Sequence, residues 1–231
     1  MATYVLVHNG FAGAWVWRQV EGFLRQNGHE VHSPTLTGLG ERQHLANPDV
    51  DLTTHIADVL GTIRCEELTN VILVGSSSSS TVIAGLAELI PDRIKVLVFV
   101  DAPIPKDGQS WFDIIGTEVS AKLLEAAQLH GNGWRVPRTD VQPPRWVPHP
   151  LASVTQKLRL VNPAAARISR TMIHCTERPP DWFFGLGGVI DQAAEDLRHS
   201  GGKVISLEAD HLPQLSQPSK LARLLASFAP S

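Results

Sequence analysis

Short runs of aliphatic and β-branched residues alternate along the chain with segments whose apolar residues recur at helical spacing. The runs predict strands over 4–8, 30–36, 70–75, 95–102, 168–175 and 203–209. The intervening segments predict helices over 15–26, 53–65, 81–90, 189–199 and 219–228. Strands that are apolar throughout are typical of a parallel sheet buried on both faces. The pattern therefore predicts an α/β fold, with a mostly parallel central sheet and helices on both faces.

Residues 103–165 break this alternation. The segment is rich in Pro and Trp, carries short helical patterns, and has too few apolar residues for a core of its own. We therefore expect one domain over 1–231, in which 103–165 is a small cap inserted over the C-terminal edge of the sheet.

The composition narrows the functional classes. The 231 residues are 43% hydrophobic and 19% charged, as in ordinary soluble proteins. A net charge of −3 gives no sign of the basic surface that binds nucleic acid or an anionic membrane. No apolar run is long enough to span a bilayer. Because the only cysteines are Cys65 and Cys175, we expect no disulfide framework and a cytoplasmic location. Two cysteines and scattered histidines offer no zinc-ligand spacing, so we expect no metal site. We expect a small-molecule substrate; the oligomeric state stays open, with a homodimer as one option.

Five consecutive serines, Ser76–Ser80, stand between a predicted strand and a predicted helix. Serine-rich segments are commonly flexible linkers, but a linker here would interrupt the middle of the sheet. A strand, a sharp turn and a helix of small residues is the setting of the G-x-S-x-G nucleophile elbow. Ser77 takes the nucleophile position after Gly75, and Ser79 stands in place of the second glycine. The backbone N–H of Ser78, at a helix N-terminus, can donate to an oxyanion.

Two further stretches supply candidate partners for this serine. The first predicted strand ends in His-Asn-Gly, where hydrolases place a second oxyanion donor, so the N–H of Gly10 is predicted to pair with that of Ser78. Asn9 adds a side-chain amide beside it. His211 follows the last predicted strand, from which it can reach Ser77 and act as its general base.

Several stretches together resemble a known family over almost the whole chain: YVLVHNGFAGAW, HSPTLTGLGER, DLTTHIADV, the serine elbow, LVFVDAPIPKDGQS and ADHLPQLSQP. They are similar to the small α/β-hydrolase esterases, a group that contains EstC-like carboxylesterases, plant methyl esterases and plant hydroxynitrile lyases. The resemblance implies the α/β-hydrolase fold, a serine–histidine–acid triad and no cofactor.

The elbow departs from the pattern of this family, which usually reads Gly-His-Ser-x-Gly-Gly. Ser76 replaces the histidine, and Ser79 and Ser80 replace the glycines. The added hydroxyls are candidates to redirect Ser77, or to draw the hydrogen bond of His211 to a neighbour. The sequence leaves open whether such an elbow still supports catalysis.

The triad acid departs as well. Plant members carry it in a CTED stretch after the penultimate strand, but this chain reads CTERPPDW, with Arg178 in place of the aspartate. Glu177 is one residue off, and Asp181 is three further on. Asp101 ends the strand next to the nucleophile strand, and some α/β-hydrolases take their acid from there. We favour Asp101, with Glu177 as the less favoured candidate and a different or missing acid as the third option.

Aromatic residues in or near the cap are expected to wall an apolar pocket: Trp111, Phe112, Trp134, Trp146, Trp182 and Phe183. Leu212, directly after His211, is assigned to the same pocket. One branch of the related lyases carries a lysine at the position of Leu212, so the lysine type of lyase is disfavoured here.

Three functions follow from these observations. The first is a serine hydrolase that cleaves a small or medium apolar carboxylic ester or lactone through an acyl-enzyme. The second, motivated by Asn9 and the altered elbow, is an acid–base enzyme like the hydroxynitrile lyases. The third is a catalytically impaired, ligand-binding member of the fold.

Overall fold

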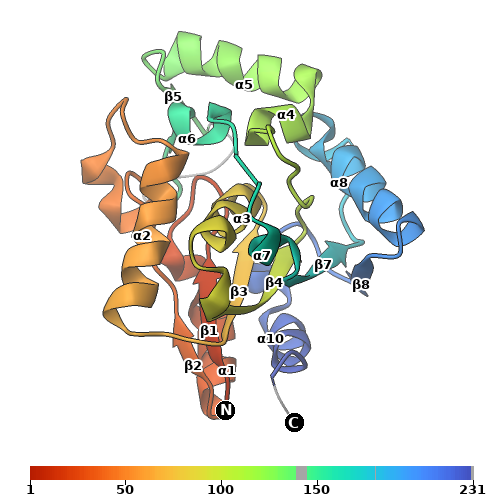
Figure 1. The fold of residues 1–231 in the computed structure, drawn as a ribbon. Helices are drawn as coiled ribbons and strands as arrows, with labels where there is room; N and C mark the ends of the chain where they lie inside the picture. Colours follow the sequence, from red (N-terminus) through yellow and green to blue (C-terminus); the bar gives the residue numbers. More distant parts are fainter. Residues whose placement is uncertain (139–144, 180, 230–231) are drawn as a thin grey trace.

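The computed structural model describes residues 1–138, 145–179 and 181–229 (Figure 1). In these residues six strands form one sheet in the order β2-β1-β3-β4-β7-β8, and every neighbouring pair is parallel. The strands are β1 (Thr3–Val7), β2 (Glu30–His32), β3 (Val71–Ser76), β4 (Ile94–Val100), β7 (Ser169–Cys175) and β8 (Lys203–Leu207). This arrangement confirms the predicted α/β fold with a parallel central sheet.

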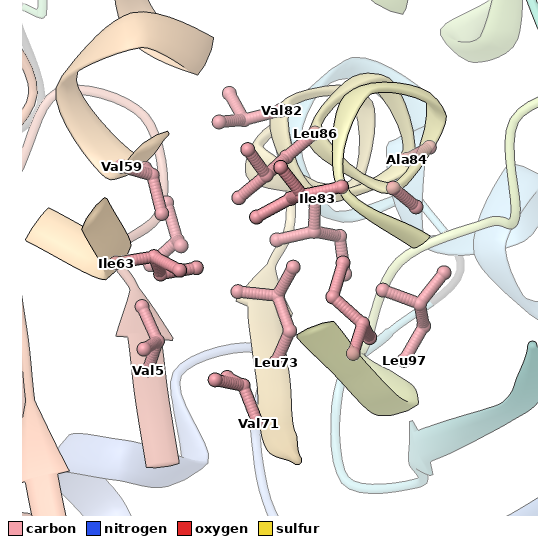
Figure 2. Packing of buried hydrophobic residues seen from close by; sticks show 14 of the residues in the cluster. Val5, Val59, Ile63, Val71, Leu73, Val82, Ile83, Ala84, Leu86 and Leu97 are labelled. Atoms are coloured by element: carbon pink, nitrogen blue, oxygen red, sulfur yellow. The ribbon is translucent and has the colours of Figure 1, made fainter. Parts of the chain in front are cut away.

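Helices cover both faces of the sheet. On one face lie α2 (Leu52–Cys65), α3 (Ser79–Leu89) and α8 (Trp182–His199), and on the other lie α1 (Arg18–Gln26) and α10 (Pro218–Ala226). Successive strand residues point to opposite faces, so Val5 and Leu73 pack beneath α2 and α3, as Figure 2 shows. Their neighbours Tyr4 and Ile72 pack against the opposite helices. Fully apolar strands are needed because both faces are buried.

Element boundaries differ from the sequence pattern in several places, and three of them are informative. The strand predicted over 30–36 ends at His32, because Pro34 has no N–H to donate to a neighbouring strand. The helix predicted from residue 15 begins as a 3-10 helix, η1 (Ala14–Trp17), which continues into α1. The helix predicted from residue 189 begins at Trp182 instead. None of the helices in the described part of the chain is long and apolar enough to cross a bilayer.

Between β4 and β7 the chain leaves the sheet. Here it forms α4 (Trp111–Ile115), α5 (Thr117–His130), β5 (Arg135–Val136), β6 (His149–Pro150), α6 (Leu151–Thr155) and α7 (Pro163–Ala166). Helices α4, α5 and α6 gather at one end of the molecule (Figure 1). An apolar cluster joins α4 and α5 to α8 through Phe112, Leu123 and Ile190. The cap over 103–165 and the single domain stay predictions, and this cluster is consistent with both.

Short segments complete the described fold. They are η2 (Gly40–Leu45), η3 (Pro91–Arg93) and α9 (Pro213–Ser216). The last of these follows β8 and begins two residues after His211. The ends of β3, β4, β7 and β8 therefore bring together the segments that carry the candidate residues.

Candidate active site

The turn between β3 and α3 holds Ser77 in a left-handed backbone conformation, with a φ of 54°. Such a φ is strained for any residue other than glycine, and it persists only where the surroundings fix it. The N–H of Ser77 donates to the carbonyl of Val100 at 3.1 Å, and its carbonyl accepts from the N–H of Ser80 at 3.0 Å. A Cβ on Gly75 would lie 3.0 Å from the carbonyl oxygen of Ser79, so the close strand–helix contact favours glycine there.

Three of the four other serines of the run are buried, and the fourth, Ser78, is half-buried and lines the cavity. The hydroxyl of Ser79 lies 3.0 Å from the carbonyl oxygen of Val7 and 2.9 Å from that of Ser76, and donates to both. The hydroxyl oxygens of Ser76 and Ser80 are buried and have no hydrogen-bond partner among the described residues. None of these three hydroxyls makes a recorded bond to Ser77 or to His211 within the described part of the chain. The sequence left open whether a neighbouring serine draws the hydrogen bond of His211 away from Ser77. In the structure this hydrogen bond is made with Ser77.

A chain of two hydrogen bonds joins Ser77 to Asp101 through His211. The distance from His211 Nδ1 to Asp101 Oδ2 is 2.6 Å, and that from His211 Nε2 to Ser77 Oγ is 3.0 Å. A carboxylate only accepts hydrogen bonds, so Nδ1 of His211 carries a proton and donates it in a hydrogen bond to Asp101. Nε2 is then unprotonated and accepts a hydrogen bond from the hydroxyl of Ser77. All three side chains are buried. This is the geometry of a nucleophile, a base and a group that orients the base.

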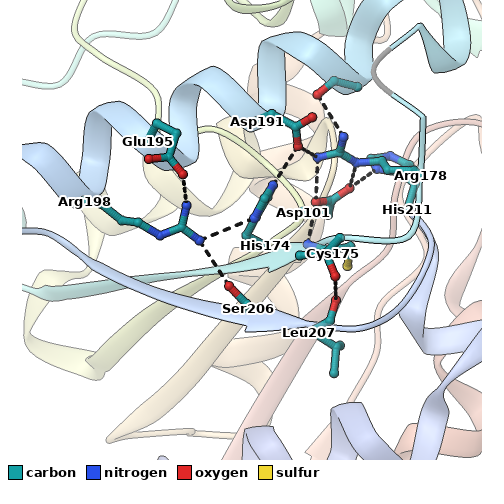
Figure 3. Close-up of polar contacts among 12 residues, drawn as sticks. Asp101, His174, Cys175, Arg178, Asp191, Glu195, Arg198, Ser206, Leu207 and His211 are labelled. Atoms are coloured by element: carbon teal, nitrogen blue, oxygen red, sulfur yellow. Dashed lines mark hydrogen bonds and ion pairs between the residues drawn. The ribbon is translucent and has the colours of Figure 1, made fainter.

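Asp101 stands directly after β4, also with positive φ, 45°. Its Oδ1 accepts from the N–H of Cys175 at 3.0 Å, and Arg178 contacts both carboxylate oxygens, Nε to Oδ2 at 2.7 Å and Nη2 to Oδ1 at 3.2 Å (Figure 3). Burial raises the pKa of this carboxyl, but hydrogen bonds and charge from His211 and Arg178 outweigh it and hold the pKa below its usual value. Asp101 is therefore held as a carboxylate.

The two acids proposed for the triad lie in different surroundings. The side chain of Glu177 is exposed, and it makes no recorded contact with His211 in the described residues. Its backbone N–H donates to the carbonyl of Ala209 at 2.9 Å. Arg178, which the sequence marks only as the place of a missing aspartate, is the partner of Asp101. The structure thus brings Asp101, not Glu177, to His211.

Gly10, Ser78 and Asn9 lie beside Ser77 and line one cavity with it. A Cβ on Gly10 would lie 3.0 Å from Ser78 Oγ, so the two candidate oxyanion donors are close neighbours. The amide of Asn9 is fixed on both sides: Nδ2 donates to the carbonyl of Gly10 at 3.0 Å, and Oδ1 accepts from Gln214 Nε2 at 3.2 Å. Gln214 is fully buried, and nothing in the sequence pattern pointed to it.

Comparison with known proteins adds to this geometry. A model described as "Alpha/beta hydrolase family" matches residues 4–224. The chain belongs to the alpha/beta hydrolase family. The carbendazim hydrolyzing esterase of Nocardioides sp. (strain SG-4G) is 35% identical over 247 residues, covering 99% of this chain and 100% of that protein. The alpha-hydroxynitrile lyase of Arabidopsis thaliana is 37% identical over 105 residues, 44% of this chain and 40% of that one.

Among solved structures, an extracellular alpha/beta-hydrolase from a Paenibacillus species matches with a TM-score of 0.81 at 23% identity, covering 100% of both chains. The predicted family and its fold are thereby confirmed. The esterase that matches this alpha/beta hydrolase along its whole length supports the predicted enzyme class, a carboxylic ester hydrolase.

The cavity of this alpha/beta hydrolase has mostly apolar walls and a free volume of about 50 Å³. By that measure one water needs roughly 10–15 Å³, so the space suits a small group. Of the predicted pocket residues, those that line it are Trp111, Phe112, Trp182, Phe183 and Leu212. Residues that the sequence did not single out complete the wall: Phe11, Leu123, Val136, Arg138, His149, Val154 and Leu186.

Trp134 and Trp146, which the sequence assigned to the pocket, are not among the described residues that line this cavity. The ring of Trp134, in the turn before β5, lies against the guanidinium of Arg135, 5.1 Å from the ring centroid. The ring of Trp146 packs edge-on against Trp15, with centroids 5.2 Å apart. These aromatic and cation–π contacts hold both rings away from the cavity.

Three buried histidines of the hydrolase lie beside the cavity: His8, His55 and His149. Burial lowers the pKa of His8 to about 4 and also lowers the pKa values of His55 and His149. Their ring nitrogens bond to backbone or hydroxyl groups, including the carbonyls of Asn9 and Thr37. They are therefore neutral structural groups at pH 7. The described residues contain no cluster of three or more His, Cys, Asp or Glu that could hold a metal ion.

Proposed function

We propose that this alpha/beta hydrolase cleaves a small or medium apolar carboxylic ester or lactone through an acyl-enzyme on Ser77. The observation that carries this proposal is the hydrogen-bond chain from Ser77 through His211 to Asp101, at the wall of an apolar cavity. The match to an esterase over the whole chain agrees with it.

In the proposed reaction, Ser77 Oγ attacks the carbonyl carbon while its proton passes to Nε2 of His211. Asp101 holds the imidazole in the required tautomer and stabilises the imidazolium without taking the proton. The backbone N–H groups of Gly10 and Ser78 stabilise the negative oxygen of the tetrahedral intermediate. His211 then returns the proton to the leaving alcohol, and water releases the acyl group by the same steps.

The cavity supports a small or medium apolar group on one side of the ester. The aromatic rings of Trp111, Phe112 and Trp182 favour an apolar substituent, and the free volume of about 50 Å³ favours a short one. Esters of acetate and butyrate suit these walls. Carbendazim belongs in the substrate panel because the esterase that is 35% identical to this chain is named for its hydrolysis.

Replacement of Ser77 by alanine tests the proposal. Ser77→Ala is expected to abolish turnover of p-nitrophenyl acetate and butyrate, because no other group is set to form the acyl-enzyme. Ser76→Ala is the matched control: it removes a buried hydroxyl without a partner from the preceding position, so turnover is expected to remain. Retained turnover in Ser77→Ala would contradict the proposal.

A lyase is the second candidate, because Asn9 lines the cavity together with Ser77 and His211. In that reaction Ser77 and His211 move a proton without an acyl-enzyme. A fluorophosphonate adduct on Ser77 together with ester turnover favours the hydrolase, and cyanohydrin cleavage without ester turnover favours the lyase. A ligand-binding protein without turnover, the third function open from the sequence, is indicated if a full panel of both substrate types binds but stays unreacted.

A further inference from the structure

The side chain of Arg178 is buried against the candidate triad acid. Only 2% of it is exposed, and the side chain of Asp101 is 0% exposed. The guanidinium meets the carboxylate along two edges, from Nε to Oδ2 at 2.7 Å and from Nη2 to Oδ1 at 3.2 Å. A fork of this kind fixes the plane of the carboxylate as well as its position.

The rest of the guanidinium is also bound, as Figure 3 shows. Nη1 donates to the carbonyl of Gly187 at 2.8 Å, and Nη2 lies 3.0 Å from Oδ1 of Asp191. Both of these partners belong to α8, whereas Arg178 follows β7 and Asp101 follows β4. The arginine, which follows β7, is therefore fixed by contacts with two other elements, the end of β4 and α8. A buried ion pair is costly unless its polar atoms are satisfied, and this one is satisfied on both sides.

The carboxylate oxygen that faces His211 is the one that Arg178 also binds. Oδ2 of Asp101 accepts from His211 Nδ1 at 2.6 Å and from Arg178 Nε at 2.7 Å. Rotation of the carboxylate would move Oδ2 away from the imidazole, and the fork opposes that rotation. The positive charge of Arg178 offsets part of the negative charge of Asp101, so Arg178 does not strengthen the negative potential that His211 experiences. Its contribution is to orient the carboxylate of Asp101.

We propose that Arg178 is a positioning residue for the reaction proposed above: its fork holds Oδ2 of Asp101 against Nδ1 of His211. This inference rests on the proposed function for its kinetic consequence. Its structural consequence, a fixed His211–Asp101 hydrogen bond, does not depend on turnover. Loss of the fork lets the imidazole leave its aligned geometry, and misplacement by about 1 Å costs on the order of 10²-fold in rate.

Methionine at position 178 keeps bulk and removes the fork. Arg178→Met is expected to lower kcat for p-nitrophenyl butyrate by about 10²-fold with KM unchanged, because the substrate cavity is not lined by Arg178. Arg178→Lys keeps the charge without the fork, so it is expected to lose most of the same kcat. Arg198→Met is the matched control: Arg198 binds Ser206, Glu195 and the ring of His174, and none of these groups contacts Asp101. His174 links Arg198 to Asp191, so this variant also tests whether the wider network acts through any route other than the fork.

Proton NMR separates this inference from the proposed function. A short N–H···O bond such as that between His211 and Asp101 gives a far-downfield imidazole resonance, whether or not any ester is turned over. The resonance is expected in the wild-type protein and in Arg198→Met, and it is expected to be lost or shifted in Arg178→Met and Arg178→Lys.

Each result has a single meaning. An inactive wild-type protein that still shows the resonance, and loses it without the fork, overturns the proposed function but supports the inference. An unchanged resonance in Arg178→Lys overturns the inference. If the wild-type protein is active, a kcat in Arg178→Met or Arg178→Lys equal to that of the wild type also overturns it. If Arg178→Met does not fold, Arg178→Lys alone decides.

Discussion

The indole ring of Trp182 lies against the imidazole of His211, with ring centroids 4.4 Å apart and ring planes tilted by 41°. Trp182 is the first residue of α8 and also lines the cavity. An aromatic face attracts a cation, so the contact favours the imidazole most when it has taken a proton.

Trp182→Leu is therefore expected to lower kcat for p-nitrophenyl butyrate by roughly 5- to 20-fold, the range of a partly desolvated cation–π contact. Trp182→Phe, which keeps an aromatic face, is expected to keep most of the activity. Trp146→Leu is the matched control, because the ring of Trp146 packs against Trp15 outside the cavity. Equal losses in Trp182→Leu and Trp182→Phe would argue that the π face has no part in catalysis.

The triad acid is tested by a pair of isosteric substitutions. Asp101→Asn is expected to lower kcat by about 10⁴-fold, because an amide no longer enforces the tautomer in which Nε2 of His211 accepts the proton of Ser77. Glu177→Gln makes the same chemical change at an exposed position and is expected to leave kcat within about twofold. Steady-state kinetics on one ester measures both. The opposite order of effects would assign the acid to Glu177.

Two glycine substitutions are expected to change stability in opposite directions. A Cβ on Gly75 would meet the carbonyl oxygen of Ser79 and a methyl of Ile83, each at 3.0 Å. Backbone cannot move aside cheaply, so Gly75→Ala is expected to lower the free energy of unfolding by about 1–3 kcal/mol. Gly61, inside α2, has open space at the same point, and Gly61→Ala is expected to raise it by up to about 1 kcal/mol.

Urea denaturation monitored by circular dichroism measures both glycine variants. Ester turnover should fall in Gly75→Ala, since the elbow must shift, and should be unchanged in Gly61→Ala. A Gly75→Ala protein as stable and active as the wild type would show that the strand–helix contact is looser than the structure has it.

The buried histidines predict how stability depends on pH. The pKa of His8 is lowered from 6.5 to about 4 in the folded state, so only the unfolded chain takes up its proton between these values. The stabilising contribution of neutral His8 is therefore complete above pH 6.5 and is lost as the pH drops toward 4. For His8 alone, the free energy of unfolding falls by roughly 3 kcal/mol over this range. His55 and His149 add to the fall in the same direction.

Asp101 acts in a separate window. Its pKa is lowered below 3.8, so its contribution is present above that value and is lost only as the pH falls through the lower, folded-state pKa. Urea unfolding at several pH values between 7.5 and 4.5 measures the histidine effect. In His55→Gln, Nε2 of the glutamine amide can keep the hydrogen bond to the carbonyl of Thr37, but the titrating imidazole is gone. The free energy of unfolding is therefore expected to depend less steeply on pH than in the wild type. An equal slope would exclude His55 as a source.

The sequence predicted the fold and much of the site because both follow from chain order. Apolar runs define the parallel strands, and the carboxyl ends of parallel strands lie at one edge, so Ser77 after β3 and Asp101 after β4 had to be near each other. His211 after β8 reaches them across the sheet edge. The shortened β2 also has a local cause, in Pro34.

What the sequence did not reveal depends on side-chain direction and on long-range contacts. Arg178 and Asp101 are 77 residues apart, and Gln214 and Asn9 are 205 apart, so no spacing rule links either pair. Aromatic content alone could not separate Trp182, which faces the cavity, from Trp134, which does not. The difference lies in how residues 103–165 and 176–188 fold, two stretches in which the sequence pattern predicted no strand or helix of definite bounds.

The hydroxyl of Ser79 shows what the elbow requires at the position of the second glycine in G-x-S-x-G. Its single proton is shared between the carbonyl oxygens of Val7, at 3.0 Å, and Ser76, at 2.9 Å, a contact that a glycine could not make. The position therefore selects for small size and permits a donor, and it does not select for glycine as such. A search of genomes for this motif that insists on glycine would pass over chains of this kind, whereas one that admits serine, and checks for a strand before it and a helix after it, would recover them.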